Sequence, residues 1–271
     1  MIGSPVVALV GRRRETALLL VVLICTCAPA SAALVSVQGD ARDLASGRLL
    51  YREQHLIRQQ QDVPIERLVV YRCPDGIAFA RKHVDYRLSR TAPDFELLDV
   101  RRGYREGLRR AAGKLLTWST QTRSSKAVPK ALRAAAGALV ADVGFDEYLR
   151  AHWDVLLAGR PQTLSFLVPT YGRTVPFRVR SLGRGQLDGV PVERFRLKLD
   201  GLLGVVGPSM DVAYLAAGKR LRRFTGVTNL RDDRGKPLKA RIDFPTASGT
   251  VDASQWQAAW SLPLSRCSLG R

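Results

Sequence analysis

The sequence is poor in the residue types that carry most metal and nucleophile chemistry. Its only histidines are His55, His83 and His152, and no two lie within four positions of each other, which excludes a sequence-local zinc pair. The HExxH, nucleophile-elbow and P-loop patterns are absent as well. His83 with Asp85 would form a ligand or acid–base pair on one strand face, although a solvated face is the simpler interpretation. No catalytic, metal or cofactor residue is assigned, and a non-enzymatic protein is favoured.

Cysteine is also scarce. Of the four cysteines, Cys25 and Cys27 fall in an apolar segment near the N-terminus, and the rest of the chain contains no CxxC pattern, so a thioredoxin-like role has no support. The other two, Cys73 and Cys267, are a disulfide candidate in an oxidising compartment. Such a bridge would close a loop of roughly 195 residues and stabilise the fold by on the order of 4–5 kcal/mol in the chain-entropy model. The spacing leaves open whether the two cysteines meet.

No apolar run has the length of a membrane-spanning helix. The longest, residues 17–28, is about a dozen residues long, whereas a transmembrane helix needs roughly 20. Three arginines precede this run and the small residues Ala30, Ser31 and Ala32 follow it. This order predicts a secretory signal peptide over residues 1–32, cleavage after Ala32 and a periplasmic location. Residues 33–271 are expected to form one β-rich domain, because no linker divides them.

Acidic residues are few beside basic ones. The chain has 43 Lys and Arg against 24 Asp and Glu, a formal charge of +19. The excess is concentrated in residues 100–133, with ten basic residues and one acidic, and in residues 216–241, with nine and two. In an exported protein the available polyanions are the anionic membrane surface and acidic polysaccharide, and nucleic acid is not an expected partner. The basic surface is therefore either a docking surface for such a polymer or for a protein partner, or merely solvated.

Alternation of apolar and polar residues is abundant. In residues 190–200, Leu197 and Leu199 alternate with basic residues, the period-2 pattern of a half-buried strand, and residues 238–244 repeat it. Turn residues such as Asp-Gly separate these segments. The block from residue 161 to residue 245 is therefore predicted to be an antiparallel meander with one apolar and one basic face.

One helix is expected to begin near Gly144 and to end before Gly159. Asp146 and Glu147 lie in its first turn, and Trp153 belongs to a set of apolar residues that recur at helical spacing. Counting all segments, the sequence predicts a mainly β (α+β) fold. It would be a single curved antiparallel sheet, or an unclosed barrel, of about eleven strands with one amphipathic helix packed across it.

Four further segments are ambiguous in the sequence. Residues 33–47 have mixed composition and are expected to be a lead-in. Residues 131–140 are rich in alanine, so a second short helix stays open, and residues 254–260 are expected to form a last helical turn or two. Residues 200–208 are apolar and glycine-rich, which indicates either a buried kink or an apolar rim of a cavity.

Several short motifs resemble a group of uncharacterised exported proteins of proteobacteria. They are residues 49–53, 71–76, 226–232 and 241–245, and the likeness extends over most of the chain after the leader. The architecture is also similar, more coarsely, to the half-barrels of the outer-membrane lipoprotein carriers, which shelter acyl chains under helices. The second likeness implies a lipid-binding role by analogy of fold alone.

The leading hypothesis is a periplasmic, non-enzymatic protein that binds a lipid or another apolar envelope molecule. The alternatives are a basic interaction protein that docks to an anionic polymer or a partner, and a hydrolase with an unrecognised site. A well-packed interior would favour the interaction protein, and a polar pocket that gathers His83 or His152 with carboxylates would favour the hydrolase. The predicted ligand-binding residues share the expected concave side: Trp153, Phe166, Phe177, Phe195, Leu197, Tyr214, Ile242 and Phe244.

Overall fold

The computed structural model describes residues 1, 32–133, 135–201, 207, 209–244 and 249–269. The predicted signal peptide falls on residues that lie outside this description, as does most of the apolar segment 200–208. The described residues from Ala32 onward belong to one compact unit, Ser31–Arg271. Within these ranges, no helix has the length and apolar character needed to cross a membrane.

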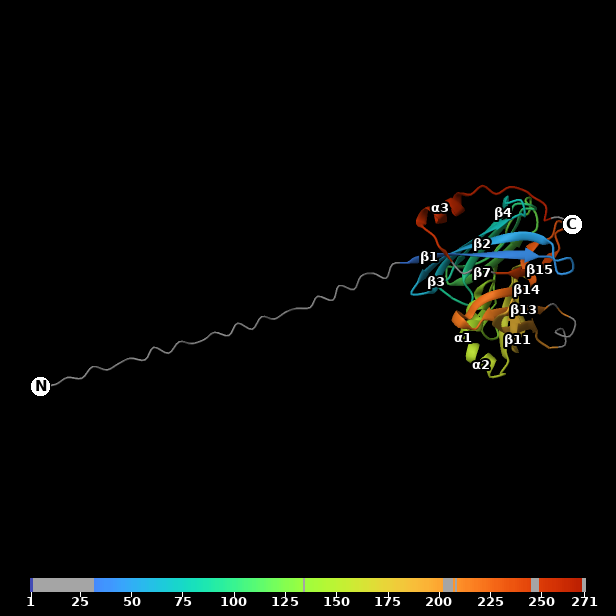
Figure 1. The fold of residues 1–271 in the computed structure, drawn as a ribbon. Coiled ribbons are helices and arrows are strands. Elements are labelled where there is room, and N and C mark those ends of the chain that lie inside the picture. Colours follow the sequence, from blue (N-terminus) through green and yellow to red (C-terminus); the bar gives the residue numbers. More distant parts are fainter. Residues whose placement is uncertain (2–31, 134, 202–206, 208, 245–248, 270–271) are drawn as a thin grey trace. The chain divides into compact units, whose positions relative to one another are not determined.

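The described residues form sixteen strands that belong to one sheet (Figure 1). The strands are β1 (Ala33–Arg42), β2 (Leu49–Gln60), β3 (Val63–Arg72), β4 (Ala78–Asp85), β5 (Asp94–Asp99), β6 (Tyr104–Ala111), β7 (Lys114–Thr120), β8 (Lys130–Ala131), β9 (Leu139–Val140), β10 (Gln162–Val168), β11 (Arg173–Leu187), β12 (Val190–Leu199), β13 (Ser209–Leu215), β14 (Arg220–Arg231), β15 (Pro237–Asp243) and β16 (Gly249–Thr250).

Strand β1 joins the two halves of this sheet. It pairs with β2 on one side and with β15 on the other, so that Asp40 lies opposite both Arg52 and Asp243. From β1, one run of strands leads through β2 to β8, and the other leads through β15 back to β9. All pairings along this path are antiparallel except that of β9 with β10. The first and last long strands of the domain are therefore neighbours in the middle of one sheet.

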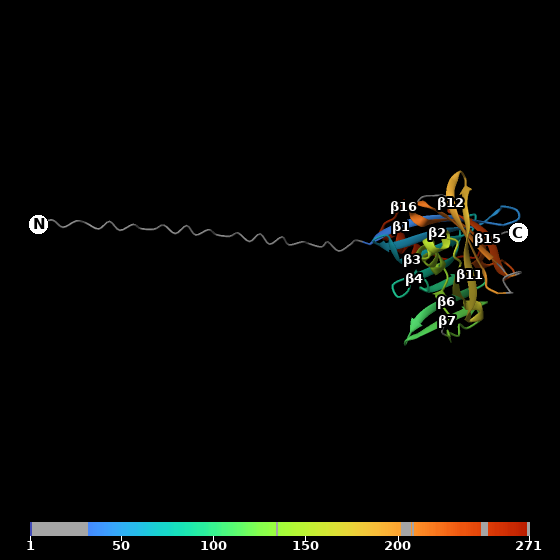
Figure 2. The ribbon, with the colours of Figure 1, turned by 90° about the horizontal axis from the view of Figure 1, so that it is seen from below.

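The sheet is not closed by strand pairing. Its edge strands, β8 and β9, have two residues each, which limits the unpaired backbone that an edge presents. The sheet nevertheless curls, since the 3-10 helix η1 (Pro169–Tyr171) after β10 packs against β6 and β7 from the other half. The hydroxyl groups of Tyr104 and Thr170 lie 3.3 Å apart at this contact. Figure 2 shows β6 and β7 near one end of β11, the strand that follows η1.

The predicted mainly β fold with one unclosed sheet is confirmed, whereas the number of about eleven strands is wrong, since the described residues form sixteen. Residues 33–47 are not a lead-in but contain β1. Its interior positions include Gly39, where a Cβ atom would come within 2.6 Å of the Phe244 ring. A small residue is needed there, and it weakens the strand pattern. The short edge strands are too brief to show alternation at all.

The predicted helix over residues 144–159 is two helices, α1 (Gly144–Ala151) and α2 (Trp153–Leu157). The break falls at His152, whose ring Nδ1 lies 2.8 Å from the carbonyl oxygen of Tyr148. Within the described part of residues 131–140 there is no helix, only the last residue of β8 and the whole of β9, so that alternative was wrong.

A third helix, α3 (Ala253–Ser261), covers the outer face of the first half of the sheet (Figure 1). It begins with a capping box in which Asp252 and Gln255 satisfy each other's backbone N–H groups. Trp256 is 2% exposed and packs in a cluster with Leu56 and Leu68 of β2 and β3. The predicted turn or two at residues 254–260 is therefore a full helix, and it buries a face of the sheet that alternation alone would leave in solvent.

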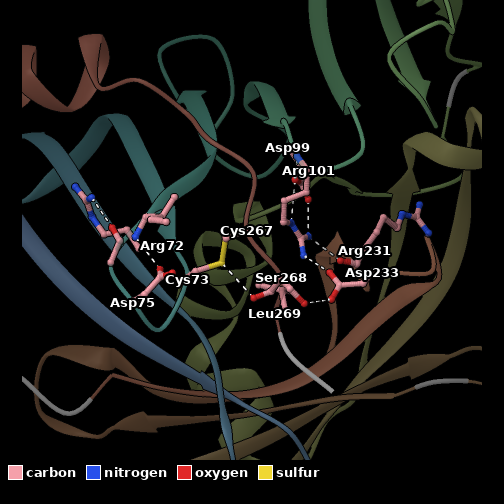
Figure 3. Close-up of a disulfide and its surroundings, with 12 residues drawn as sticks. Arg72, Cys73, Asp75, Asp99, Arg101, Arg231, Asp233, Cys267, Ser268 and Leu269 are labelled. Carbon is pink, nitrogen blue, oxygen red and sulfur yellow. Dashed lines mark hydrogen bonds and ion pairs between the residues drawn. A yellow bond between two sulfur atoms is a disulfide. The ribbon is translucent and has the colours of Figure 1, made fainter.

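The C-terminal tail is fastened to one end of the sheet. Cys267 is joined to Cys73 by a disulfide, and Leu269 is 2% exposed within the main core (Figure 3). The hydroxyl of Ser268 donates a hydrogen bond of 2.7 Å to Asp233, whose other carboxylate oxygen lies 3.3 Å from Arg101. We call this end, at residues 73–76, 169–173 and 231–237, the tail end of the sheet. The opposite end, at the turns 61–62 and 216–219 and near α2, is the helix end.

Removal of the disulfide should destabilise the domain strongly. The bridge spans 194 residues of sequence, so its loss in Cys73→Ser/Cys267→Ser should lower the free energy of unfolding by about 4–5 kcal/mol, chiefly by freeing the unfolded chain. Urea unfolding of the variant and the wild type measures the difference. Dithiothreitol should produce a similar loss in the wild type and none in the variant. A loss below about 1 kcal/mol would contradict this account of the tail.

Candidate functional site

The interior of the curled sheet holds a cavity of about 860 Å³. This volume lies in the range of pockets that take small organic molecules, roughly 300–1,000 Å³. The second half of the sheet, from β10 to β15, contributes a wall that is largely apolar. Its side chains alternate between the cavity and the outer surface, as strand geometry requires. The apolar wall includes Phe166, Phe177, Leu199, Met210, Phe224 and Ile242.

The first half of the sheet contributes most of the buried charged side chains of the lining, together with apolar ones such as Val37, Ile57 and Phe95. On β2 every second residue faces inward, so Tyr51, Glu53 and His55 form one row. The neighbouring strands add further ionisable groups, and the resulting cluster consists of Tyr51, Glu53, His55, Arg67, Lys82 and Glu106. The cavity therefore has a largely apolar wall from the second half of the sheet and a wall with a cluster of buried polar and charged side chains from the first half; we call the second one the polar wall.

The eight residues predicted to bind a ligand separate into two groups. Phe166, Phe177, Ile242 and Phe244 line the cavity.

The other four lie outside the cavity lining, in the core beneath α2. The ring of Trp153 packs against Phe195 and Tyr214 with centroid distances of 5.1 and 5.7 Å. Phe195, Leu197 and Tyr214 are 0% exposed. The sequence placed seven of them on one concave side of the sheet, with Trp153 on a helix able to cover that side, and α2 fills part of it.

The two histidines that the sequence singled out lie away from the cavity. His83 does not pair with Asp85, because its Nε2 lies 2.7 Å from Glu66 and its ring packs against Trp260. His152 stacks on Tyr148 at the break between α1 and α2. Within the described ranges, no three His, Cys, Asp or Glu side chains gather in a way that could hold a metal ion.

The histidine that does face the cavity is His55, which sequence reasoning passed over. Its Nε2 lies 2.7 Å from Glu53, and both side chains are buried. Burial lowers the pKa of His55, and the cations Arg67 and Lys82 lower it further, whereas the hydrogen bond with Glu53 raises it. The imidazole therefore stays neutral in the folded protein near pH 7. The alternating row Tyr51, Glu53 and His55 was the available signal.

A buried ion pair ties the polar wall to the segment that leads into α1. Lys82 of β4 and Asp142 are 3% and 7% exposed, and their charged atoms lie 2.8 Å apart. Asp142 has a φ of 48°, a left-handed conformation that aspartate tolerates better than most residues. Loss of one partner would leave a buried charge unpaired, which typically costs several kcal/mol. The pair therefore fixes where α1 enters the interior.

A second polar network connects the two halves across the tail end. Glu106 of β6 accepts hydrogen bonds from the Tyr104 hydroxyl, at 2.6 Å, and from Asn229 of β14, at 3.0 Å. Arg231 donates to the hydroxyls of Tyr104 and Thr170, at 3.1 and 2.7 Å. Burial raises the pKa of Glu106, and its two hydrogen-bond donors and Arg231 act against that rise. These bonds join strands that the sheet itself does not pair.

Comparison with known proteins identifies a fold but no activity. No family model and no curated protein matches the sequence. The chain is similar in structure to a β-barrel-like protein of the domain of unknown function DUF1849 from Brucella abortus, with a TM-score of 0.50 and 10% sequence identity. The likeness covers 82% of this chain and 98% of that one.

At such low identity this likeness shows the fold alone. The neighbour is a proteobacterial β-rich protein of unknown function, which is consistent with the group that the sequence motifs resemble. Fold and site thus define the class as a mainly β protein with one unclosed, curled sheet around an internal cavity. Export and similarity to lipoprotein carriers stay predictions.

The pH dependence of stability should reveal the buried state of His55. Since its pKa is lowered from 6.5 in the folded protein, the unfolded chain binds this proton more readily, and stability should fall as the pH drops below 6.5. One such proton contributes a slope of up to about 1.4 kcal/mol per pH unit. His55→Gln keeps a donor for Glu53 and should flatten the slope between pH 6.5 and 5. Urea unfolding across this range measures it, and equal slopes for variant and wild type would contradict the assignment.

Proposed function

We propose that the protein is a non-enzymatic periplasmic binding protein that holds an amphiphilic envelope molecule, such as a lipid or an acyl chain, in this cavity. The single observation that carries the proposal is the division of the cavity into one apolar and one polar wall. An acyl chain would bury its methylene groups against the apolar wall, at roughly 0.8 kcal/mol for each buried group. A polar head would find hydrogen-bond partners on the opposite wall.

The cavity also distinguishes this proposal from the interaction-protein alternative. That alternative is favoured by a well-packed interior, whereas about 860 Å³ of the interior lies between side chains here. Several residues of the two basic windows are occupied within the fold. Arg101 pairs with Asp99, Arg105 with Glu96, Arg110 with Asp94, and Arg223 and Arg241 with Asp243. Internal pairing therefore accounts for part of the clustering of basic residues.

The hydrolase alternative has less support. It requires His83 or His152 in a polar pocket with carboxylates, and neither residue lines the cavity. The cavity contains His55 with Glu53 instead. Among the described residues the His55 ring is hydrogen-bonded to Glu53, and no serine, threonine or cysteine is bonded to the ring as a triad would require.

Charge placed in the apolar wall should abolish ligand binding. Leu199 is partly buried and lines the cavity, so Leu199→Glu should weaken binding of a fluorescent fatty-acid probe at least about tenfold, equivalent to about 1.4 kcal/mol. Leu199→Trp should also weaken binding, because it fills space without adding charge. The matched control is Leu88→Glu, at a residue that is 71% exposed and outside the lining; it should leave binding unchanged.

Two further measurements complete this test. Protein purified without detergent should release an extractable apolar molecule that displaces the probe, and the melting temperatures of the variants should show that loss of binding is not loss of fold. Two results together would favour the interaction-protein alternative over this function: no such molecule is released, and the probe binds no more strongly than to an unrelated basic protein.

A further inference from the structure

The polar wall contains one cation, Arg67, that has no hydrogen bond or ion pair among the described residues. Arg67 lies on β3, opposite Ile57 of β2 and Val84 of β4, and lines the cavity towards the helix end. The Nε–H group of Arg67 is buried and has no hydrogen-bond acceptor among the described residues. No carboxylate of these residues lies within ion-pair distance of the guanidinium. The guanidinium lies over the ring of Tyr86, 5.8 Å from the ring centroid. This contact satisfies none of its N–H donors.

Three other cations of the cavity lining have ion-pair or hydrogen-bond partners. Lys82 is paired with Asp142 at 2.8 Å, and Arg150 of α1 is paired with Asp146 at 3.1 Å. Arg231 donates to two hydroxyl groups at the tail end. The Nε–H groups of Arg150 and Arg231 are also buried without an acceptor, but these two side chains have other partners. Arg67 has no hydrogen bond or ion pair among the described residues, and an anion beside its buried Nε–H group would offset the cost of that unsatisfied donor.

The charges near Arg67 favour an anion over a cation at this place. Lys82 lies near Arg67, since both cations lower the pKa of His55. Arg220 at the helix end also lines the cavity, and it has no ion pair in the described part of the chain. Of the carboxylates that line the cavity here, Asp62 is exposed on the β2–β3 turn, Asp142 is paired with Lys82 and Asp146 with Arg150. Glu53 is the remaining one, and it is hydrogen-bonded to His55. A positively charged head would be repelled here, whereas a carboxylate or phosphate could accept two parallel N–H bonds from the guanidinium.

We infer that the ligand is an amphiphile with an anionic head, a carboxylate or a phosphate, and that Arg67 binds this head while the chain extends along the apolar wall towards the tail end. This inference rests on the proposed function. It adds the charge of the ligand, its orientation in the cavity and the residue that determines its specificity.

The test compares two probes that differ only in the head group. Hexadecanoate and hexadecanol compete with a fluorescent fatty-acid probe for the wild type, Arg67→Gln, Arg67→Lys and Arg72→Gln. Arg72 is a matched control, because it lies on the same strand, outside the cavity lining, and donates to the carbonyl of Gly76.

The wild type should prefer hexadecanoate to hexadecanol by at least about tenfold, since hydrogen bonds to a charged partner contribute roughly 1.5–3 kcal/mol. Arg67→Gln should remove this preference by weakening hexadecanoate alone. Arg67→Lys should restore part of it, and Arg72→Gln should change nothing. The melting temperature of Arg67→Gln should fall little, because among the described residues the substitution breaks no hydrogen bond or ion pair and removes only the contact with the Tyr86 ring.

The contrary outcomes are separable. Equal affinity of the wild type for both probes, or an equal loss of both in Arg67→Gln, would overturn the anionic head but leave the amphiphile site in place. Failure of both probes to bind would overturn the proposed function and this inference together. If inorganic phosphate or acetate alone bound as tightly as hexadecanoate, and with the same dependence on Arg67, the site would be one for a free oxyanion and the amphiphile would be excluded.

Discussion

The pairing of β1 with both β2 and β15 is the constraint on which the rest of the structure depends. It places two segments separated by nearly the whole domain side by side, with Ala41 opposite Tyr51 on one strand and Ile242 on the other. The polar first half and the apolar second half thereby become the two walls of one interior. Without this pairing, each half would be a separate meander with an exposed edge, and neither would enclose space.

The polar wall explains why the interior is not filled. Charged side chains cannot pack as closely as aliphatic ones without losing their hydrogen bonds, and each buried charge needs a partner. Lys82 meets this need by pairing with Asp142, and Glu106 meets it by bonds that include one to Asn229 of the other half, whereas Arg67 has no such partner among the described residues. These bonds hold the two walls at a distance. The disulfide and the buried Leu269 then fix the tail end.

Much of the fold could be predicted from the sequence, because alternation is a local property. The faces of β12 and β15 follow directly from Leu197, Leu199 and Ile242. The site was only partly predictable. The row Tyr51, Glu53 and His55 shows period 2, but a charged strand face is normally solvated, and only curling of the sheet turns this one inward. Likewise, no local pattern shows that α2 buries Phe195 and Tyr214 while Phe177 stays beside open space.

The most direct test of the account is the location of a bound amphiphile in a crystal of the protein. A fatty acid with bromine at its terminal carbon gives an anomalous signal, which locates the end of the acyl chain directly. The bromine should lie beside Phe177 and Leu199 in the apolar wall, with the carboxylate at the guanidinium of Arg67. Two results would contradict the account: a bromine outside the cavity, or a carboxylate at the tail end. Either would mean that the apolar wall does not bind the acyl chain while the polar wall binds the head.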